Sequence, residues 1–394
     1  MVSTMRAFHP GPSVDTQTIR DHGAFSALRS DWNSLLERSA VDSPWRTHQW
    51  LDHWWDAFGG DARLLVPTVW SKGRLVAAAP MMVVEETIKR LDVQVLRFVA
   101  NAVTPRSGFL VDPDADRGTT VLWSLVKALS KEWDLAILAN VPRDVWLDQW
   151  RTALTDTGMR FVETLDRRSP FIDLSQGFQA FRRTISPKLR ENINASRNRL
   201  SRLGVVDVQS VLGTGDVPGA LETCFDISAR SWKAGAGSDL GGRPAYRAFY
   251  RALAEDEVLR RRLYIWILTV DGQPIAFNMV MRGDRGVIGL ATDYDLAFKM
   301  CSPGVYLFST LLQDLCTLGV DQCDMAGDLY DYKLYWTKQY LPHSQFWIYH
   351  GGPKSRLLYF LKDRTLPTLR RRQASAVPGA NVRDSPPGPA DSSA

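Results

Sequence analysis

The stretch LYIWILTVDGQPIAFNMVMRGDRGVIGLATDYDLAFKMCSPG, residues 263–304, decides the fold class. It holds three runs of apolar and β-branched residues, which predict three strands, at 263–270, 274–281 and 287–294. The dipeptide Asp271-Gly272 separates the first two runs and is a strong signal for a tight hairpin. The stretch therefore predicts an antiparallel meander.

A Ser302-Pro303-Gly304 turn follows the meander and predicts the start of a helix. The first turn of a helix presents unpaired N–H groups and a partial positive charge, which together bind pyrophosphate. Pro303 has no N–H and stiffens the turn, whereas Gly304 lets a phosphate approach the backbone. The turn thus predicts a phosphate site, with an ordinary turn as the alternative. The residues assigned to this site are Ser302, Pro303, Gly304, Val305 and Tyr306.

The first half of the chain repeats this order of elements, which indicates two similar α/β domains from an old duplication. Gly73 joins two strand-like runs there, at 64–70 and 75–84, as Gly272 does in the second half. Before its next helix the first half has acidic residues that would repel pyrophosphate, namely Asp112, Asp114 and Asp116. We therefore expect the phosphate site only in the second half, and an acceptor cleft between the two domains.

The expected domain limits follow from composition and from the strand pattern. Residues 1–20 lack periodicity and 373–394 are rich in Pro, Ser, Ala and Gly, so both are predicted to be disordered tails. The two domains are expected at 21–165 and 166–352, and a basic helix at 353–372.

The bulk composition is that of a globular protein large enough for two domains, with 394 residues, 45% of them hydrophobic and 23% charged. The four cysteines fit neither a zinc pattern nor a disulfide framework, which favours a reducing compartment. Because the sequence has neither a long apolar run nor a signal peptide, we expect a cytoplasmic protein without a membrane span.

The net charge of +5 is unevenly distributed. Residues 181–203 hold seven basic residues against one acid, and residues 356–372 hold six against one, so the rest of the chain is mildly acidic. Two basic patches on an acidic body suggest an anionic cofactor or partner. Solvated helix faces are the alternative interpretation.

Several motifs along residues 25–350 resemble one family. They are QWLDHWWDAFGG (49–60), GRLVAAAP (73–80), Trp133-Asp134, Trp232-Lys233, DGQPIAF (271–277), Asp295, SPG (302–304) and DMAGDLYDYKLYW (324–336). In these motifs the chain resembles the GNAT acyltransferase superfamily, and within it the tandem-domain, CelD-like "acetyltransferase 6" group associated with cellulose and exopolysaccharide biosynthesis. The usual phosphate loop of that superfamily, Q/R-x-x-G-x-G/A, is reduced here to Lys299 and the single Gly304.

The resemblance implies a fold and a co-substrate. The fold is α/β with a mixed α+β sheet, in two tandem GNAT-like domains, each a largely antiparallel meander with helices on both faces. Domain 21–165 is then a degenerate copy and domain 166–352 the catalytic one. Acetyl-CoA or another acyl-CoA is the implied co-substrate, with its pyrophosphate on the turn at Ser302 to Gly304.

Acylation of an amine needs a base, a polarised carbonyl and a proton for the leaving thiolate. Asp293 and Asp295 end the third predicted strand on one face, so either can serve as the base or simply bond within the loop. Asp295 ranks first because, by the resemblance, it matches a family position. By the resemblance, Tyr332 is the candidate acid and Lys333 the candidate phosphate or acceptor ligand.

The remaining assignments concern the substrate. Trp232, Lys233 and Asp328 are assigned to the acceptor, with core packing as the alternative for Trp232. The six His form no cluster, and neither a Cys–His pair nor G-x-S-x-G occurs, so metal binding and hydrolase chemistry are not expected.

The leading function is transfer of an acyl, most simply an acetyl, group from acyl-CoA to an amine of a sugar or other small metabolite, in polysaccharide biosynthesis. One alternative is a Fem-type aminoacyl transferase that takes its donor from aminoacyl-tRNA, which the basic segment 187–203 suits. Another is a non-catalytic GNAT-like scaffold. Neither DNA nor a membrane is an expected partner.

Overall fold

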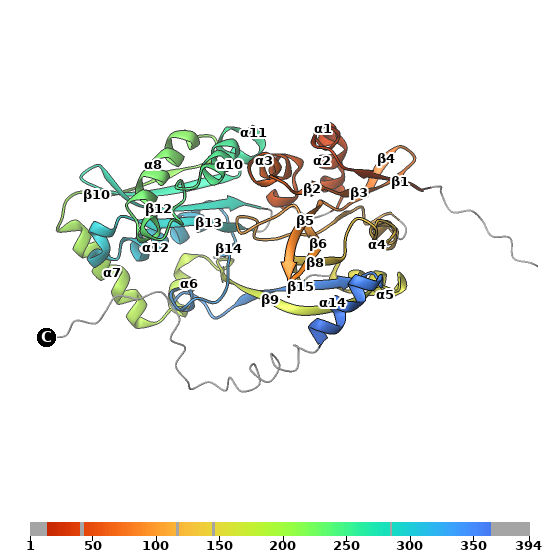
Figure 1. The fold of residues 1–394 in the computed structure, drawn as a ribbon. Coiled ribbons are helices and arrows are strands. Elements are labelled where there is room, and N and C mark those ends of the chain that lie inside the picture. Colours follow the sequence, from red (N-terminus) through yellow and green to blue (C-terminus); the bar gives the residue numbers. More distant parts are fainter. Residues whose placement is uncertain (1–13, 40–42, 116–117, 144–145, 284–285, 364–394) are drawn as a thin grey trace, which may run out of the picture.

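The computed structural model describes residues 14–39, 43–115, 118–143, 146–283 and 286–363 (Figure 1). The N-terminal half contains β1 (Val14–Ile19), α1 (His22–Ala27), α2 (Arg29–Arg38), η1 (Pro44–Arg46), α3 (His48–Phe58), β2 (Arg63–Leu64), β3 (Val66–Ser71), β4 (Arg74–Ala78), β5 (Met81–Ile88), β6 (Leu91–Phe98), β7 (Leu110–Val111), α4 (Gly118–Ala128), β8 (Leu135–Pro142), α5 (Trp146–Asp156) and β9 (Arg160–Asp173).

The C-terminal half follows with a similar order of strands and helices. It contains α6 (Phe178–Thr184), α7 (Pro187–Ser201), β10 (Val206–Val211), α8 (Val217–Ala229), α9 (Trp232–Gly235), α10 (Pro244–Glu255), α11 (Glu257–Arg260), β11 (Leu263–Val270), β12 (Gln273–Arg282), β13 (Val287–Tyr294), η2 (Leu296–Cys301), α12 (Pro303–Thr317), β14 (Gln322–Asp324), α13 (Asp331–Leu334), β15 (Tyr340–Tyr349) and α14 (Pro353–Asp363).

Among the described residues, the strands form one large and one small sheet. The large sheet has eleven strands in the order β10-β11-β12-β13-β14-β9-β15-β8-β6-β5-β2, and the small sheet has four in the order β1-β3-β4-β7. Most neighbours are antiparallel, but β13 pairs parallel with β14, and β6 pairs parallel with β8. This mixed sheet with helices on its faces confirms the predicted fold class.

The meander forms where the sequence predicted it. Strands β11, β12 and β13 pair antiparallel in chain order. Asp271 and Gly272 both have positive φ, 47° and 77°, which is the backbone of the tight hairpin turn that Asp-Gly favours. Helix α7 likewise starts at the predicted signal, because the Ser186 side chain accepts a hydrogen bond from Leu189 N and Pro187 occupies the first turn.

Helices cover both faces of this meander (Figure 1). On one face α8 and α10 pack into a hydrophobic core with β11 and β12, through residues such as Leu221, Phe249 and Phe277. On the other face α12 and α7 form a second core, with Leu311 and Leu189 buried against Trp266. The meander is therefore held rigidly from both sides.

The observed strands correct two predicted boundaries: the end of the N-terminal tail and the border between the two domains. Residues 14–19, expected to belong to a disordered tail, form β1 and pair with β3 from Val14↔Ser71 to Ile19↔Val66. This edge strand is mostly exposed and polar, so its sequence lacks the apolar alternation that marks a strand. The rest of tail 1–20, up to residue 13, the tail 373–394 and the basic segment beyond residue 363 lie outside the described residues.

The predicted boundary between residues 165 and 166 falls inside the single long strand β9. Residues 160–170 of β9 pair with β15, while 171–173 pair with β14 of the C-terminal half. Strand β15, the last strand of the described residues, pairs in turn with β8 of the N-terminal half. The halves thus contribute strands to each other, and one sheet crosses both.

The predicted strand 75–84 is also two strands. Ala79 and Pro80 interrupt it, because proline has no N–H to donate to a ladder. The piece before the break, β4, joins the small sheet, and the piece after it, β5, joins the large one. In the C-terminal half the corresponding β12 is continuous.

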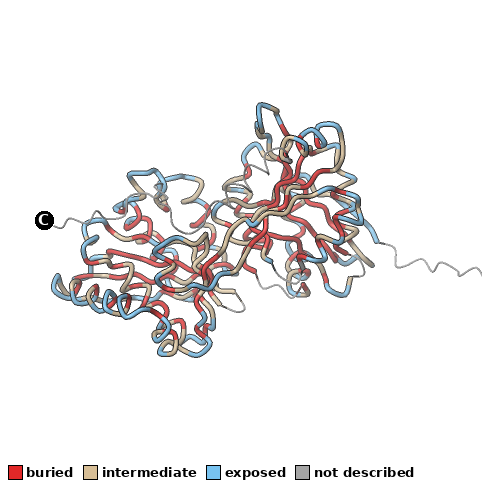
Figure 2. Tube along the Cα trace, turned by 90° about the horizontal axis from the view of Figure 1, so that it is seen from below, coloured by how far each residue is buried: buried red, intermediate tan, exposed pale blue. Residues whose placement is uncertain are grey.

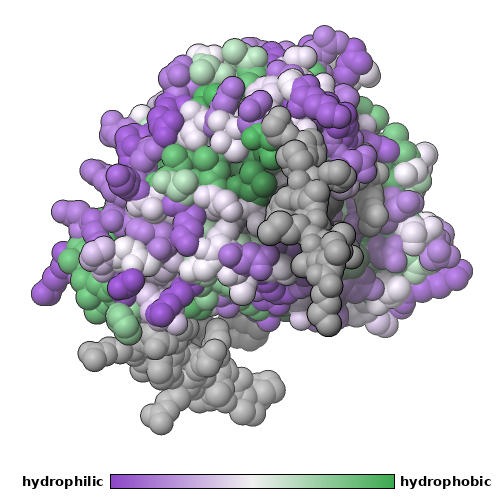
Figure 3. Space-filling model, turned by 90° about the vertical axis from the view of Figure 1, so that its right-hand side faces the viewer, coloured by the Kyte–Doolittle hydropathy of each residue, from purple (hydrophilic) through white to green (hydrophobic). Residues whose placement is uncertain are grey.

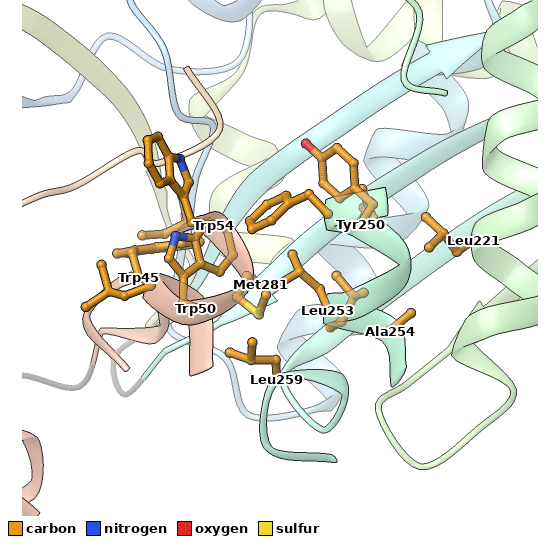
Figure 4. Packing of buried hydrophobic residues seen from close by; sticks show 14 of the residues in the cluster. Trp45, Trp50, Trp54, Leu221, Tyr250, Leu253, Ala254, Leu259 and Met281 are labelled. Atoms are coloured by element: carbon orange, nitrogen blue, oxygen red, sulfur yellow. The ribbon is translucent and has the colours of Figure 1, made fainter. Parts of the chain in front are cut away.

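A core shared by both halves lies at their contact. Trp50 and Trp54 of α3 face Leu253 and Tyr250 of α10 (Figure 4). The rings of Trp50 and Phe249 meet edge to face, with centroids 5.0 Å apart. Seen from below, two lobes with buried strands inside are joined by strands that pass between them (Figure 2).

Hydrophilic residues cover most of the face shown in Figure 3, and apolar residues gather there in separate patches. Within the described part of the chain, none of the helices combines the length and the apolar run that crossing a membrane requires. All four cysteines, Cys224, Cys301, Cys316 and Cys323, are free thiols.

Candidate active site at the open edge of β13

The C-terminal sheet has an opening beside β13. Its partner β14 pairs with it at two positions only, Val287↔Cys323 and Ile288↔Asp324. From Gly289 to Tyr294 that edge of β13 has no strand partner among the described residues, and we call these six residues the open edge. A register shift at Leu290 marks a β-bulge, which adds twist where the opening begins.

The N-terminus of α12 lies beyond the end of this edge, after η2. Ser302 precedes the helix with a left-handed φ of 54°, and its side chain makes no capping bond. A side chain at Gly304 would have no atom within 4 Å, so the first turn faces open space. Pro303 has no N–H and Val305 N is bonded to Ser302 O, so the N–H that this turn offers to an anion is that of Gly304.

The other residues predicted around the phosphate support this turn. Pro303 is buried at the first helical position, Val305 N donates to Ser302 O, and Tyr306 packs against the core under α12. Helix α7 closes the far side, because Ser196 Oγ donates to Ser302 O over 3.0 Å. Gly304 is thus the residue of the predicted five that opens the turn to a ligand.

Asp293 lies on the face of β13 that α8 and α9 cover. It is 6% exposed; its carboxylate accepts a hydrogen bond from Ser228 Oγ over 2.7 Å and pairs with Lys233 Nζ at 2.9 Å. Lys233 Nζ also donates to the carbonyl of Thr292 on the open edge. Burial raises the pKa of Asp293, although the Lys233 ammonium opposes that shift.

Asp295 has a different setting, at the first turn of η2. One carboxylate oxygen accepts a hydrogen bond from Ala297 N, and the other pairs with Arg230 Nε at 2.6 Å. Both oxygens therefore hold local structure, the alternative that the sequence left open for this pair of acids.

The loop between β14 and α13 borders the opening on its other side. A side chain at Gly289 would lie 3.4 Å from Met325 O, which places this loop against the open edge. Lys333, 5% exposed, donates from Nζ to Met325 O at 3.1 Å and to Ala326 O. Burial lowers the pKa of Lys333 to about 8, while the carboxylates of Asp324 and Asp328 oppose that shift.

Two tyrosines of this region are exposed beside the lysine. The rings of Tyr330 and Tyr332 are parallel within 3°, with centroids 6.1 Å apart, and Lys333 Nζ lies 5.1 Å from the first ring. Although the Tyr332 residue is 55% exposed, the surrounding chain partly desolvates its phenol, which raises its pKa to about 12 and keeps it protonated at neutral pH. Asp328 accepts backbone bonds from Arg168 and Leu329 and so orders the same loop.

Apart from Asp295, the predicted site residues thus fall into three groups around one opening. Trp232, 48% exposed, and Lys233 begin α9 beside Asp293. Asp328, Tyr332 and Lys333 belong to the opposite loop, and Ser302 to Tyr306 form the turn before and within α12. Two residues of this region were not predicted from the sequence: Ser228, which bonds to Asp293, and Arg106, which bonds to Asp324. Each lies far from its partner along the chain, by 65 and 218 residues.

At the corresponding place in the N-terminal half, the start of α4 packs closely against β7. A side chain at Gly118, the first residue of α4, would lie 3.1 Å from Val111 Cγ1. Asp112 is buried and paired with Arg38 at 2.8 Å and with Arg74 at 3.4 Å. Its charge is therefore neutralised rather than free to repel an anion, and Asp116 lies outside the described residues.

Residues 187–334, from α7 to α13, match the family model described as "Acetyltransferase (GNAT) domain". They contain the meander, the open edge and α12, and this part of the chain belongs to the GNAT acyltransferase family. The predicted resemblance to the acetyltransferase 6 group is confirmed. No curated protein matches the chain in sequence.

Solved structures share the fold across both halves. The chain is similar to the crystal structure of FemX, with 11% identity, a TM-score of 0.57, and 84% of this chain and 98% of that one covered. It is also similar to the C-terminal domain of a putative lysylphosphatidylglycerol synthetase from Agrobacterium fabrum, with 14% identity, a TM-score of 0.52, and 87% and 97% covered. A tandem GNAT protein from the clavulanic acid biosynthesis pathway aligns with 12% identity and a TM-score of 0.46 over 86% and 99%.

Proposed function

We propose that the protein is an N-acyltransferase that moves an acyl group, most simply acetyl, from acyl-CoA to an amine of a sugar or another small metabolite. A role in polysaccharide biosynthesis follows the family resemblance. The observation that carries the proposal is the pairing of the open edge of β13 with the uncapped, open N-terminus of α12. Together they offer backbone groups for a pantetheine arm and, for its pyrophosphate, the N–H of Gly304 with the partial positive charge of the α12 N-terminus.

The chemistry assigns one task to each side of the opening. The acceptor amine attacks the thioester carbonyl, the carbon–sulfur bond breaks, and CoA leaves as a thiolate. We propose that Asp293 accepts the proton from the amine, because burial raises its pKa and makes it a better base than an ordinary carboxylate. Tyr332, whose phenol is protonated at neutral pH, supplies a proton to the thiolate.

A negative charge introduced at position 304 tests the proposed donor site. We expect Gly304→Glu to abolish acetyl-CoA binding in calorimetry, because a carboxylate there opposes the pyrophosphate by several kcal/mol in a close site. The fold should persist, since a side chain there meets open space and an acid at a helix N-terminus adds about 0.3–1 kcal/mol of stability.

Gln313→Glu is the matched control, because it adds the same charge to an exposed position further along α12. It should bind acetyl-CoA as the wild type does. Equal affinity in wild type and Gly304→Glu would remove this turn as the phosphate site. Release of the CoA thiol in the presence of amino sugars or other amines then identifies the acceptor.

A second candidate, transfer from aminoacyl-tRNA, is favoured by the charge on α7. Lys188, Arg197 and Arg202 are exposed on and just after this helix, which packs against α12 beside the phosphate turn. Such a surface suits a nucleic-acid backbone. Calorimetry with tRNA in place of acetyl-CoA separates the two, and a protein that binds neither is a scaffold.

A further inference from the structure

One carboxylate, that of Asp324, joins both halves of the protein at the base of the opening. Asp324 is the last residue of β14 and pairs with Ile288, immediately before the open edge of β13 begins. One of its oxygens pairs with Arg106 Nη2 at 2.5 Å. The other accepts hydrogen bonds from Ser169 Oγ of β9 at 2.5 Å and from Ala326 N at 2.8 Å.

These bonds fix the loop that faces the open edge. Ala326 has a left-handed φ of 54°, which an alanine adopts only where its surroundings require it. Two sets of hydrogen bonds hold Ala326 in this conformation. Ala326 N donates to Asp324, and Lys333 donates to the carbonyls of residues 325 and 326. The distance between this loop and Gly289 therefore depends on where Asp324 is held.

Arg106 reaches Asp324 from the N-terminal half, in the segment between β6 and β7. That segment is anchored to β8 by a bond from Ser107 N to Asn140 O. Asp324 is 2% exposed, and the neighbouring His343 is 1% exposed. Removal of Arg106 would leave the buried Asp324 carboxylate with its hydrogen bonds from Ser169 and Ala326 N but without the cation that it pairs with, and breaking a buried ion pair in this way is costly.

We propose that Arg106 is a positioning residue for the acyl site: through Asp324 it holds the 325–327 loop at the distance from β13 that admits the acyl-pantetheine arm. This inference rests on the proposed function. It gives the N-terminal half a part in the donor site of the other half.

Arg106→Ala tests the proposal against a matched control, Arg38→Ala. Arg38 also pairs with an aspartate that is 2% exposed, Asp112, and its side chain is exposed to a similar extent, 28% against 27%, but it lies away from the opening. We expect both variants to lose thermal stability. Only Arg106→Ala should lower kcat/KM for acetyl-CoA, by about 10- to 100-fold, the usual effect of a small misplacement of a binding wall.

Hydrogen exchange in the ligand-free protein gives a readout that needs no activity. The amides of residues 325–333 should exchange faster in Arg106→Ala than in wild type and Arg38→Ala. Arg106→Lys keeps the charge but not the planar fork of donors, so it should fold and give intermediate exchange and kinetics. It serves as the test variant if Arg106→Ala does not fold.

Unchanged exchange of residues 325–333 in folded Arg106 variants would overturn the positioning role. If an Arg106 variant shows faster exchange but wild-type kcat/KM for acetyl-CoA, Arg106 has no link to the acyl site. The same conclusion follows if Arg38→Ala lowers kcat/KM as much as Arg106→Ala does. If the wild type does not bind acetyl-CoA, the proposed function is wrong, and the link between Arg106 and an acyl site is wrong with it. The hydrogen-exchange comparison would still show whether Arg106 holds the 325–327 loop.

Discussion

Asp293 and Asp295 lie two residues apart at the end of β13, yet their surroundings give them different capacities. Both carboxylates are buried and both face a cation. One carboxylate oxygen of Asp295 accepts a hydrogen bond from Ala297 N in the first turn of η2, and the other accepts one from Arg230 Nε. Asp293 bonds instead to a serine hydroxyl and to Lys233, a group that also contacts the open edge. We therefore place Asp293 above Asp295 as the base, in reverse of the order suggested by the sequence.

The two asparagine variants should separate these roles. We expect Asp293→Asn to lower kcat by about 10²- to 10⁴-fold, the range for a lost general base, with acetyl-CoA affinity near wild type. In the wild type kcat/KM should rise with pH through the raised pKa of Asp293, because only the ionised carboxylate accepts the proton. Asp295→Asn should keep the cap of η2, because asparagine caps as well as aspartate, and should lose only the ion pair with Arg230, which costs about 1 kcal/mol of stability and leaves kcat near wild type. A large kcat defect in Asp295→Asn alone would restore the original order.

The elements that the sequence predicted well are those built from short-range signals. The meander, its Asp-Gly hairpin and the Pro-Gly start of α12 each depend on residues within about ten positions of one another, as do the strand pattern and turn types. The path of β9 could not be predicted, because one strand serves two partners, β15 and β14, that follow it by more than 140 residues. The same distance hides Arg106, since nothing near it in sequence indicates a carboxylate at Asp324.

The loop from β14 to α13 gives a second case, in which sequence identified the residue but not its contacts. Lys333 was expected to bind a ligand; in the structure its ammonium holds the carbonyls of Met325 and Ala326. Its burial has a thermodynamic consequence. The ammonium is charged in water up to the ordinary pKa of 10.5 but only to about 8 in the fold. Between these values the unfolded chain binds more protons, so the free energy of unfolding should rise with pH.

Urea unfolding at pH 8, 9 and 10 checks this sign. The free energy of unfolding of the wild type should rise relative to that of Lys333→Met by about 2 kcal/mol between pH 8 and pH 10, which is the part of the shift that falls in this interval. The comparison cancels the groups that titrate in both proteins. Lys131→Met, at an exposed position, is the control and should follow the wild type. Parallel pH curves for wild type and Lys333→Met would show that the buried ammonium is not destabilised.

The halves resemble each other in the order of their elements, but they do not form separate bodies. The strand exchange between β9 and β15 carries one sheet through both, and a single hydrophobic core includes Trp50 of the N-terminal half with Phe249 and Leu253 of the C-terminal half. A polar contact also joins the two halves, since His53 Nε2 lies 3.3 Å from a carboxylate oxygen of Asp256. A cut at the predicted boundary would split β9 and expose this core. Cooperative unfolding of the whole molecule follows.

Two fully buried tryptophans of the N-terminal half test that cooperativity. Trp50 contacts the C-terminal half, whereas Trp123 packs with Phe109 and Trp150 inside its own half. Each change to alanine should cost about 3–5 kcal/mol. Native-state hydrogen exchange then reports on the slowest amides of β12, in the other half. If the molecule unfolds as one unit, both variants lower the protection of these amides by the same free energy as they lower global stability. Trp123 belongs to a hydrophobic core that contains residues of β15 but none of β12, so its effect on β12 can pass only through global unfolding. Wild-type protection of β12 in Trp123→Ala would mean that the halves unfold separately.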